Sequence, residues 1–442
     1  MVIKRIKLVL LTATLLRAKC VFSEDLLTVY QQALEADPAL KSAMLKLDIV
    51  AAQKQQAVGE MLPQVTASAN WSANNQRLSS VGSTATSNYK GTRYVLSVNQ
   101  SLIDFAKFWN WRRAQEVENQ YSAESIEARH VLIDSVVDKY FSVLEAEDQL
   151  FFFGKEKQAT EKQLEQVKKQ YAKQLLKITD LYEVEARLDQ IQASEIEAET
   201  ILVRARESLK ALSNTTPARL FKLRDDIDFK PLEGELDDWI AVAKSENPVL
   251  AAQISALAAA SDDVVMQKSK HLPVVDLQFN YYNTDTGYQS ARTPETEVQV
   301  AAINVTMPIF SGGITSQRVN EAQLRLALTE NENEAKVRAL IKETSDAFLS
   351  SNASVRRVKA TVKALESSRK SREAKEKGFK YGVETISDVL DAQQVEFRAE
   401  RDLSQAKYGY IKNRIRFMHA IGLISVENLM EINEWLQQPA TQ

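Results

Sequence analysis

Four short segments of this chain alternate between apolar and polar residues. Alternation over about ten residues predicts a strand with one apolar and one wet face, as in membrane barrels. We therefore expect two strand hairpins, at about 64–104 and about 274–309. The alternating segments are 64–72, 94–102, 275–281 and 301–307.

A soluble, half-buried hairpin would show the same alternation, but two features favour a membrane barrel. The expected hairpin loops, about 73–91 and 283–295, are long and polar. Aromatic residues such as Trp71, Tyr94 and Tyr281 lie near strand ends, as in an interfacial girdle. Because an open sheet edge in lipid leaves backbone groups unpaired, four spanning strands would require two, three or four copies of the chain.

Long helical runs follow each expected hairpin. From Ala106 to about Gln174 there is no proline and only one glycine, Gly154. At about 1.5 Å per residue, a helix of this length reaches roughly 100 Å. The run at about 315–377 has a similar length, and shorter helices are expected at about 181–212 and 389–420. Helices this long must lie along one another as coiled coils.

Proline positions indicate that the chain is built twice from one plan. Asp37-Pro38 and Leu62-Pro63 interrupt the helical pattern, and Asn247-Pro248 and Leu272-Pro273 repeat both breaks at an offset of 210. We therefore expect an internally duplicated chain with mainly α structure. The expected divisions are a first repeat at 24–212 and a second repeat at 236–423. The segment at 213–235 and the tail at 424–442 are expected to pack around the middle of the long helices, and we call them equatorial.

The N-terminal residues 1–23 have the pattern of a secretory signal peptide. Basic residues precede the apolar run Leu8–Leu16, and we expect cleavage before Glu24. The single cysteine, Cys20, lies in this segment. A lipoprotein is the alternative, but Arg17 and Lys19 differ from the small residues that lipoprotein processing needs.

Composition argues against nucleic-acid binding and against a helical membrane protein. The net charge is −3 and the pI is about 5.9, so there is no basic field to hold nucleic acid. No stretch after the leader reaches about 18 consecutive apolar residues, which excludes a transmembrane helix.

Sequence motifs also argue against an enzyme, a metal site or a cofactor. His130, His271 and His419 lie far apart and have no metal-ligand spacing. No glycine-rich phosphate loop, nucleophile elbow or cysteine–histidine pair is present. We expect no catalytic residue, no metal and no cofactor.

One turn recurs in both halves and joins the long helix to the shorter one. Tyr171–Asp180 aligns with Phe379–Asp388 at an offset of 208, with an aromatic residue, a break, an isoleucine, a hydroxyl residue and an aspartate in each. We expect Thr179 or Asp180, and Ser387 or Asp388, to cap the helix that follows.

Taken together, these motifs resemble the TolC family of trimeric outer-membrane channel proteins over essentially the whole mature chain. The resemblance rests on the doubled proline breaks, on Met307–Gly313 at a strand end with Ser101–Asp104 at the corresponding place, and on Gly382–Ala392 followed by Tyr408–Leu423. It implies a homotrimer with a twelve-stranded β-barrel in the outer membrane, continued by an α-helical barrel in the periplasm.

The resemblance also implies a function and partners. Such channels are passive exit ducts in outer-membrane lipid, docked by an inner-membrane transporter and a periplasmic adaptor protein. Drug efflux and type I protein secretion use the same duct, so both remain open. A soluble periplasmic coiled-coil adaptor or structural protein is the alternative, although it would not need the alternating strands.

By the same resemblance, the repeated turn lies at the periplasmic tip, where the channel narrows. Asp388 and Asp391 correspond to aspartates that face the bore. Their spacing of three places them on one helix face, so three subunits would supply a ring of six carboxylates that binds cations. The simpler interpretation is a helix cap at Asp388 and a solvated charge at Asp391.

The resemblance further implies a gate formed between the two turns. Thr179 and Asp180 match the family, but Phe379 stands where the family has a tyrosine and Glu384 where it has an arginine. Since Phe379 has no hydroxyl and Glu384 would repel Asp180, we expect closure not to depend on the aromatic–aspartate hydrogen bond. Lys173 or Lys177 could replace the missing partner.

Overall fold

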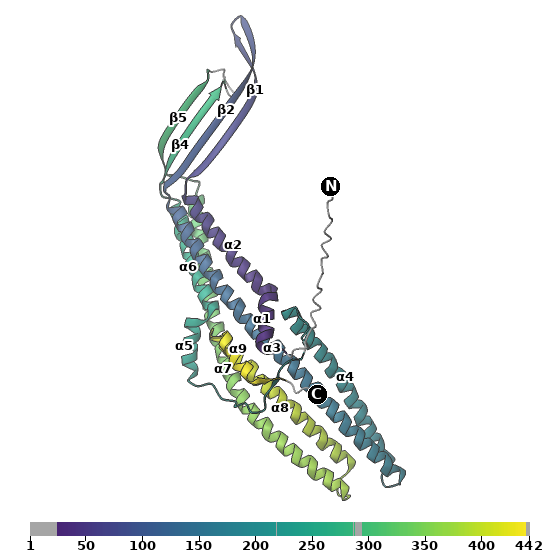
Figure 1. Cartoon of the computed structure of the whole chain (residues 1–442). Helices are drawn as coiled ribbons and strands as arrows, with labels where there is room; N and C mark the ends of the chain where they lie inside the picture. The colour runs from purple at the N-terminus through teal and green to yellow at the C-terminus, as the bar shows by residue number, and fades with distance from the viewer. Residues whose placement is uncertain (1–23, 218, 286, 288–293, 439–442) are drawn as a thin grey trace, which may run out of the picture.

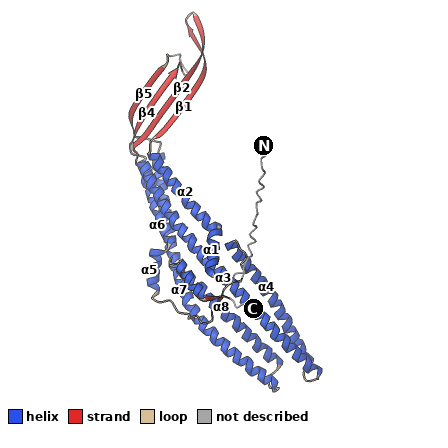
Figure 2. Cartoon of the chain, in the orientation of Figure 1, coloured by secondary structure: helices blue, strands red, loops and turns tan. Residues whose placement is uncertain are grey.

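The computed structural model describes residues 24–217, 219–285, 287 and 294–438. These residues form an elongated molecule with a four-stranded sheet at one end and two helical hairpins at the other (Figure 1). Helix predominates, and the strands of the sheet are confined to one end (Figure 2). The expected leader at 1–23, including Cys20, lies outside the described residues.

The same succession of elements occurs twice along the chain: two helices, two strands, a long helix and a shorter helix. The first set is α1 Leu26–Ala36, α2 Pro38–Met61, β1 Gln64–Ser80, β2 Ser83–Ile103, α3 Phe105–Ala172 and α4 Ile178–Ser213. The second set is α5 Leu236–Glu246, α6 Pro248–Ser269, β4 Val274–Asp285, β5 Thr296–Thr306, α7 Ile314–Lys380 and α8 Ile386–Ala420.

Two of the four proline breaks, Asp37-Pro38 and Asn247-Pro248, are helix junctions with a side-chain cap. The Asp37 carboxylate accepts a hydrogen bond from the backbone N–H of Leu40 at 2.8 Å, and Pro38 is the first residue of α2. The Asn247 side chain accepts from the N–H of Val249 at 2.9 Å ahead of Pro248. Proline is tolerated here because the first helical N–H has no intrahelical acceptor.

The four strands form one antiparallel sheet in the order β1-β2-β4-β5. Its register aligns the apolar residues across strands: Val98 lies opposite Phe279, and Phe279 lies opposite Ala301. Asn99, Gln278 and other polar residues fall on the opposite face. The sheet thus has the apolar and polar faces that the alternation predicts, and β1 and β5 are its edges.

The expectation of a loop at 73–91 is wrong, because β1 and β2 continue through most of this segment. β1 and β2 stay paired from Gln64 opposite Asn99 to Ser80 opposite Ser83, and only Val81 and Gly82 turn. The polar composition resembled a loop, but two strands can remain hydrogen-bonded in water without an apolar face. Of the second expected loop, 283–285 belong to β4, and 286 and 288–293 lie outside the described residues.

The long helices form two hairpins, α3 with α4 and α7 with α8, and α3 also packs against α8. The expected helix lengths are confirmed, since α3 has 68 residues and α7 has 67. In the part of the chain that the structure describes, α6 is the one helix long and apolar enough to cross a membrane. The sequence expectation had excluded any such helix. Here α6 packs along α3 and α7.

The main hydrophobic core lies near the middle of the long helices. It contains the fully buried side chains of Tyr140, Phe141 and Tyr410. The segment between the two sets contributes β3 (Lys222–Leu223), which pairs with β6 (Leu436–Gln437) beyond α9 (Val426–Glu434). Burial raises the pKa of the Tyr140 hydroxyl, which donates to the Phe221 carbonyl at 3.0 Å.

Candidate functional site

Both helical hairpins end in the same turn. The turn after α3 places Gln174 at φ 59°, and the turn after α7 places Gly382 at φ 75°, an offset of 208 residues. In each, the next residue donates back to the end of the long helix: Leu175 to the Gln170 carbonyl at 3.0 Å and Val383 to the Gly378 carbonyl at 2.9 Å. The alignment of the two turns in sequence is therefore also an alignment in structure.

The second helix of each hairpin begins earlier than the sequence indicates. The N-cap of α8 is Thr385, whose hydroxyl accepts from the N–H of Asp388 at 3.2 Å, and Asp388 accepts from the N–H of Thr385 at 3.0 Å. In α4, Asp180 accepts from the N–H of Lys177 at 3.1 Å. The N-caps are Lys177 and Thr385, so none of the four candidate residues is the N-cap itself. Both aspartates are the third helical residue, a capping-box position.

Asp388 is held in its ionised form. Hydrogen bonds from the hydroxyl and the backbone N–H of Thr385 keep the pKa of this carboxyl below its usual value, and the Lys375 ammonium lies 3.7 Å away. A carboxylate in the first turn of a helix is also favoured by the helix dipole. Asp388 therefore combines the capping role with a carboxylate that keeps its negative charge to lower pH than an ordinary aspartate.

Asp391 lies one turn further on and contacts the other hairpin. The Arg187 guanidinium of α4 donates to its carboxylate at 3.1 Å. Only 17% of the Arg187 side chain is exposed, against 66% of the Asp391 side chain. The arginine is therefore held in place, while the carboxylate keeps its access to water.

A second bond joins the hairpins in the same register. The Ser387 hydroxyl donates to the Glu183 carboxylate at 2.5 Å. The offset from Glu183 to Ser387 is 204, and the offset from Arg187 to Asp391 is also 204. Helices α4 and α8 thus run in register for one turn. We call these two bonds the tip ladder. The sequence analysis did not predict the tip ladder. Its signal was the spacing of four residues between Glu183 and Arg187 on α4, matched by the same spacing between Ser387 and Asp391 on α8.

The expected gate residues occupy different environments. Thr179 is exposed at the second position of α4. Phe379 packs against a small apolar cluster that includes Val184 of α4 and Ile386 of α8. Glu384 folds over Gly378, where an added Cβ would lie 2.5 Å from the Glu384 Cγ. Among the described residues, no hydrogen bond or ion pair joins Phe379 or Glu384 to Asp180.

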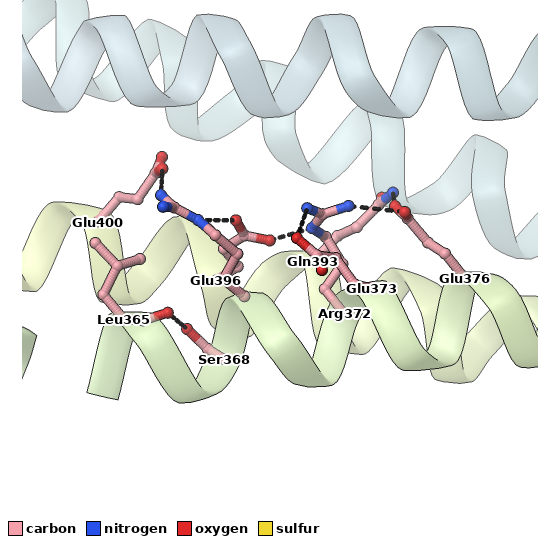
Figure 3. Close-up of polar contacts among 9 residues, drawn as sticks. Leu365, Ser368, Arg372, Glu373, Glu376, Gln393, Glu396 and Glu400 are labelled. Atoms are coloured by element: carbon pink, nitrogen blue, oxygen red, sulfur yellow. Dashed lines mark hydrogen bonds and ion pairs between the residues drawn. The ribbon is translucent and has the colours of Figure 1, made fainter. Parts of the chain in front are cut away.

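Ion pairs brace the α7–α8 hairpin above the turn (Figure 3). The nearly buried Glu396 carboxylate of α8 pairs with Arg372 and, at 3.3 Å, with Arg369, both from α7. Arg372 also binds Glu376 at 2.7 Å, and Gln393 donates to Glu376 at 3.3 Å. The contacts of Glu396 and Gln393 tie α8 to α7 along this part of the hairpin.

Helices α3 and α8 are joined over a long distance between the core and the tip. Lys412 of α8 pairs with Glu145 at 3.4 Å, the Tyr408 hydroxyl donates to Asp148 at 2.9 Å, and Arg401 pairs with Glu156 at 2.8 Å. Acidic residues of α3 thus face basic or hydroxyl residues of α8. Arg401–Glu156 is the α3–α8 pair nearest to the tip. Among the described residues, the next bonds between the two hairpins are those of the tip ladder.

Two histidines that are distant in sequence, His130 and His419, lie together in the structure. The rings of His130 and His419 are 6.4 Å apart, and His419 contacts Glu127 at 2.9 Å. Burial lowers the pKa of His130. Burial alone would also lower that of His419, but Glu127 and neighbouring carboxylates raise it. Within the described ranges no group of three or more such ligands could hold a metal ion.

Comparison with known proteins extends over both halves of the chain. The family model described as outer membrane efflux protein matches residues 29–215 and 239–423. Outer membrane protein TolC of Vibrio cholerae is 29% identical over 429 residues, 95% of each chain. Alkaline protease secretion protein AprF of Pseudomonas aeruginosa is 26% identical over 421 residues, 92% of this chain and 86% of AprF.

The fold is also similar to that of a solved outer-membrane channel. The crystal structure of the Campylobacter jejuni CmeC outer membrane channel has a TM-score of 0.79 at 16% identity, covering 94% of this chain and 90% of that chain. The expected resemblance and the mainly α fold with strands of a membrane β-barrel are therefore confirmed, and a soluble coiled-coil adaptor is not favoured. The matched family is one of transport proteins. The chain belongs to the outer membrane efflux protein family and is a channel protein of the outer membrane.

Proposed function

We propose that three copies of this protein form a passive exit duct across the outer membrane and periplasm. The proposal rests on two features that lie at opposite ends of the elongated molecule. The sheet has an apolar face and two unpaired edges, β1 and β5, while the paired turns with their aspartates form the other end (Figure 1). Closing the edges between copies satisfies the backbone in lipid.

The tip is the constriction of this duct. Asp388 and Asp391 supply two carboxylates per copy, and Asp388 stays ionised because Thr385 caps it. Rings of carboxylates select cations in pores. Each carboxylate has one basic neighbour, Arg187 at 3.1 Å from Asp391 and Lys375 at 3.7 Å from Asp388.

The tip ladder holds the duct closed in place of a bond from Phe379 to Asp180. Arg187–Asp391 and Ser387–Glu183 join the two hairpins at their ends, and the apolar cluster around Phe379 supports them. The braced α7–α8 hairpin can then move about the Arg401–Glu156 pair when the ladder breaks. Thr179, Asp180 and Glu384 shape the turns.

The duct acts with an inner-membrane transporter and a periplasmic adaptor, and it catalyses no reaction itself. Support comes from relatives named for outer-membrane and protease-secretion roles. Both drug efflux and type I secretion fit such a duct. We also assign residues 1–23 to a leader, 24–212 and 236–423 to duplicated repeats, and 213–235 and 424–442 to the equator.

Planar-bilayer recordings on the purified full-length protein test this function. Single channels should appear with low conductance and a reversal potential that favours cations. Asp388→Asn should reduce cation selectivity with little change in conductance, whereas Asp391→Asn should raise conductance because it removes the ion pair with Arg187. Recovery of the protein in the soluble periplasmic fraction, or selectivity unchanged by Asp388→Asn, would contradict the proposal.

A further inference from the structure

An apolar cavity of about 650 Å³ lies where the sheet meets the helices. It is bounded by the end of α2, the end of β2 and the first turns of α3. Its lining contains Phe105, Phe108 and Trp109 together with the charged residues Asp104 and Lys107. Neither the tip nor the channel function uses this cavity.

The apolar face of the sheet leads directly into the cavity. A bulge at Leu102 shifts the register, so that Ile103 lies opposite Val275, and Val275 lies opposite Val305. This row continues the face that carries Leu277 and Ile303, and both Leu102 and Ile103 are exposed. A hydrocarbon chain lying along this face of the sheet would reach the cavity past Ile103 and Val275.

Aromatic residues mark the cavity as a membrane–water interface. Phe108 contacts Trp109 and Trp111 with ring centroids 5.8 Å apart in each pair. Phe105 and Phe108 are exposed, whereas both tryptophans are half-buried. Tryptophan is enriched at the level of the headgroups, where an apolar ring with one polar edge fits best.

Lys107 gives the cavity a cationic hydrogen-bond donor. The Lys107 ammonium donates one hydrogen bond, to the Ser101 hydroxyl at 2.6 Å, and Ser101 in turn donates to Asp276 at 2.9 Å. An ammonium has three donors, so two remain for another acceptor. The Asp104 carboxylate is engaged by the backbone N–H groups of Ala106 and Lys107 at 2.9 and 3.2 Å.

A second cation lies beside the same aromatic wall. The Arg112 guanidinium lies over the Trp109 ring, 5.2 Å from its centroid, and its nearest carboxylate, Asp262, is 3.7 Å away. Basic residues next to a membrane surface attract anionic lipid headgroups. The cavity and its rim thus combine apolar, aromatic and cationic side chains, the three kinds of contact that an anionic phospholipid makes.

We propose that this cavity binds an anionic glycerophospholipid, with one acyl chain against Ile103 and Phe108 and the phosphate on Lys107. The lipid would fix the depth of the barrel in the membrane at the junction with α3. The site does not depend on how the tip closes, so lipid binding can be tested independently of the gate.

Lipid titration of the delipidated full-length protein, followed by native mass spectrometry, tests the site. Phosphatidylglycerol should bind more tightly than phosphatidylethanolamine. Lys107→Gln should weaken phosphatidylglycerol binding by about five- to tenfold, and Phe108→Ala should weaken both lipids. Lys46→Gln is the matched control, since Lys46 is an exposed lysine of α2 outside the cavity. Equal binding by the Lys107 and Lys46 variants would overturn the proposal.

A second experiment asks whether another copy of the chain covers the cavity instead. Phe310 is 88% exposed near the lower end of β5, which a neighbouring copy would bring close to β1. A Leu102→Cys, Phe310→Cys variant should remain uncrosslinked between copies if lipid occupies the cavity. Rapid disulfide formation between copies would show that protein fills it and would overturn the proposal.

Discussion

At the scale of single residues, Asp388 and Asp391 are three positions apart but have different surroundings. Asp388 is bound within its own helix start by Thr385, and Asp391 is bound across the hairpins by Arg187. Sequence spacing predicted that the two carboxylates share a helix face, and the resemblance pointed to the tip. Neither could reveal Arg187, which lies 204 residues away and is brought there by the packing of α4 against α8.

The capping of Asp388 predicts how selectivity depends on pH. Its lowered pKa means that the carboxylate stays charged as pH falls through the ordinary value of 3.8, and its charge is lost only below that value. Thr385→Ala removes the hydroxyl that lowers the pKa, so selectivity should fall at a higher pH than in the wild type.

Reversal potentials measured from pH 6 to pH 3 check this shift. Thr361→Ala is a suitable control, because the Thr361 hydroxyl donates only within α7, to the carbonyls of Arg357 and Val358 at 3.0 Å. Superimposable pH profiles of wild type and Thr385→Ala would show that the cap does not govern the charge of Asp388.

At the scale of elements, the α7–α8 hairpin depends on one nearly buried carboxylate. Glu396→Gln leaves Arg369 and Arg372 without their shared counter-ion, which should cost about 1–2 kcal/mol after allowance for the partly exposed arginines. Glu366→Gln is the control, since it removes an exposed pair with Lys370 worth about 0.5 kcal/mol or less.

Amide hydrogen exchange detects the difference locally. Amide protection in the C-terminal half of α7 and the N-terminal half of α8 should drop about 5- to 30-fold in Glu396→Gln. It should change little in Glu366→Gln. Equal losses of protection in both variants would mean that Glu396 braces the hairpin no more than a surface charge does.

Elements themselves were largely predictable from the sequence, because local signals specify them. Asp37-Pro38 and Asn247-Pro248 end and cap helices by chemistry confined to a few residues. The helix start at Ile386 was misplaced because several hydroxyl and acidic residues near it can cap. The extended β1–β2 ribbon was missed because its polar residues are held by backbone pairing, which side-chain composition does not record.

At the scale of the whole molecule, the sheet requires partners. β1 and β5 are edges in the chain that the structure describes, and a membrane leaves no water to satisfy them. In an antiparallel closure the start of β1 meets the end of β5 of the next copy. Val65 and Val305 lie at these ends and are 63% and 67% exposed.

A Val65→Cys, Val305→Cys variant should therefore form disulfides between copies and run as a covalently linked trimer. Oxidation before denaturing electrophoresis measures this. The pair Val65→Cys, Val298→Cys, which places the second cysteine at the opposite end of β5, should not crosslink. Crosslinked species that stop at dimers would contradict a closed ring of three.

The central claim is that the tip ladder closes the duct, and the conductance of single channels tests it most directly. Arg187→Ala should raise conductance several-fold over the wild type, while Arg204→Ala, an exposed arginine higher on α4, should leave it unchanged. Phe379→Tyr should also have no effect, because Phe379 packs in the apolar cluster. An Arg187→Ala channel as tightly closed as the wild type, or tight closure gained by Phe379→Tyr, would contradict the account.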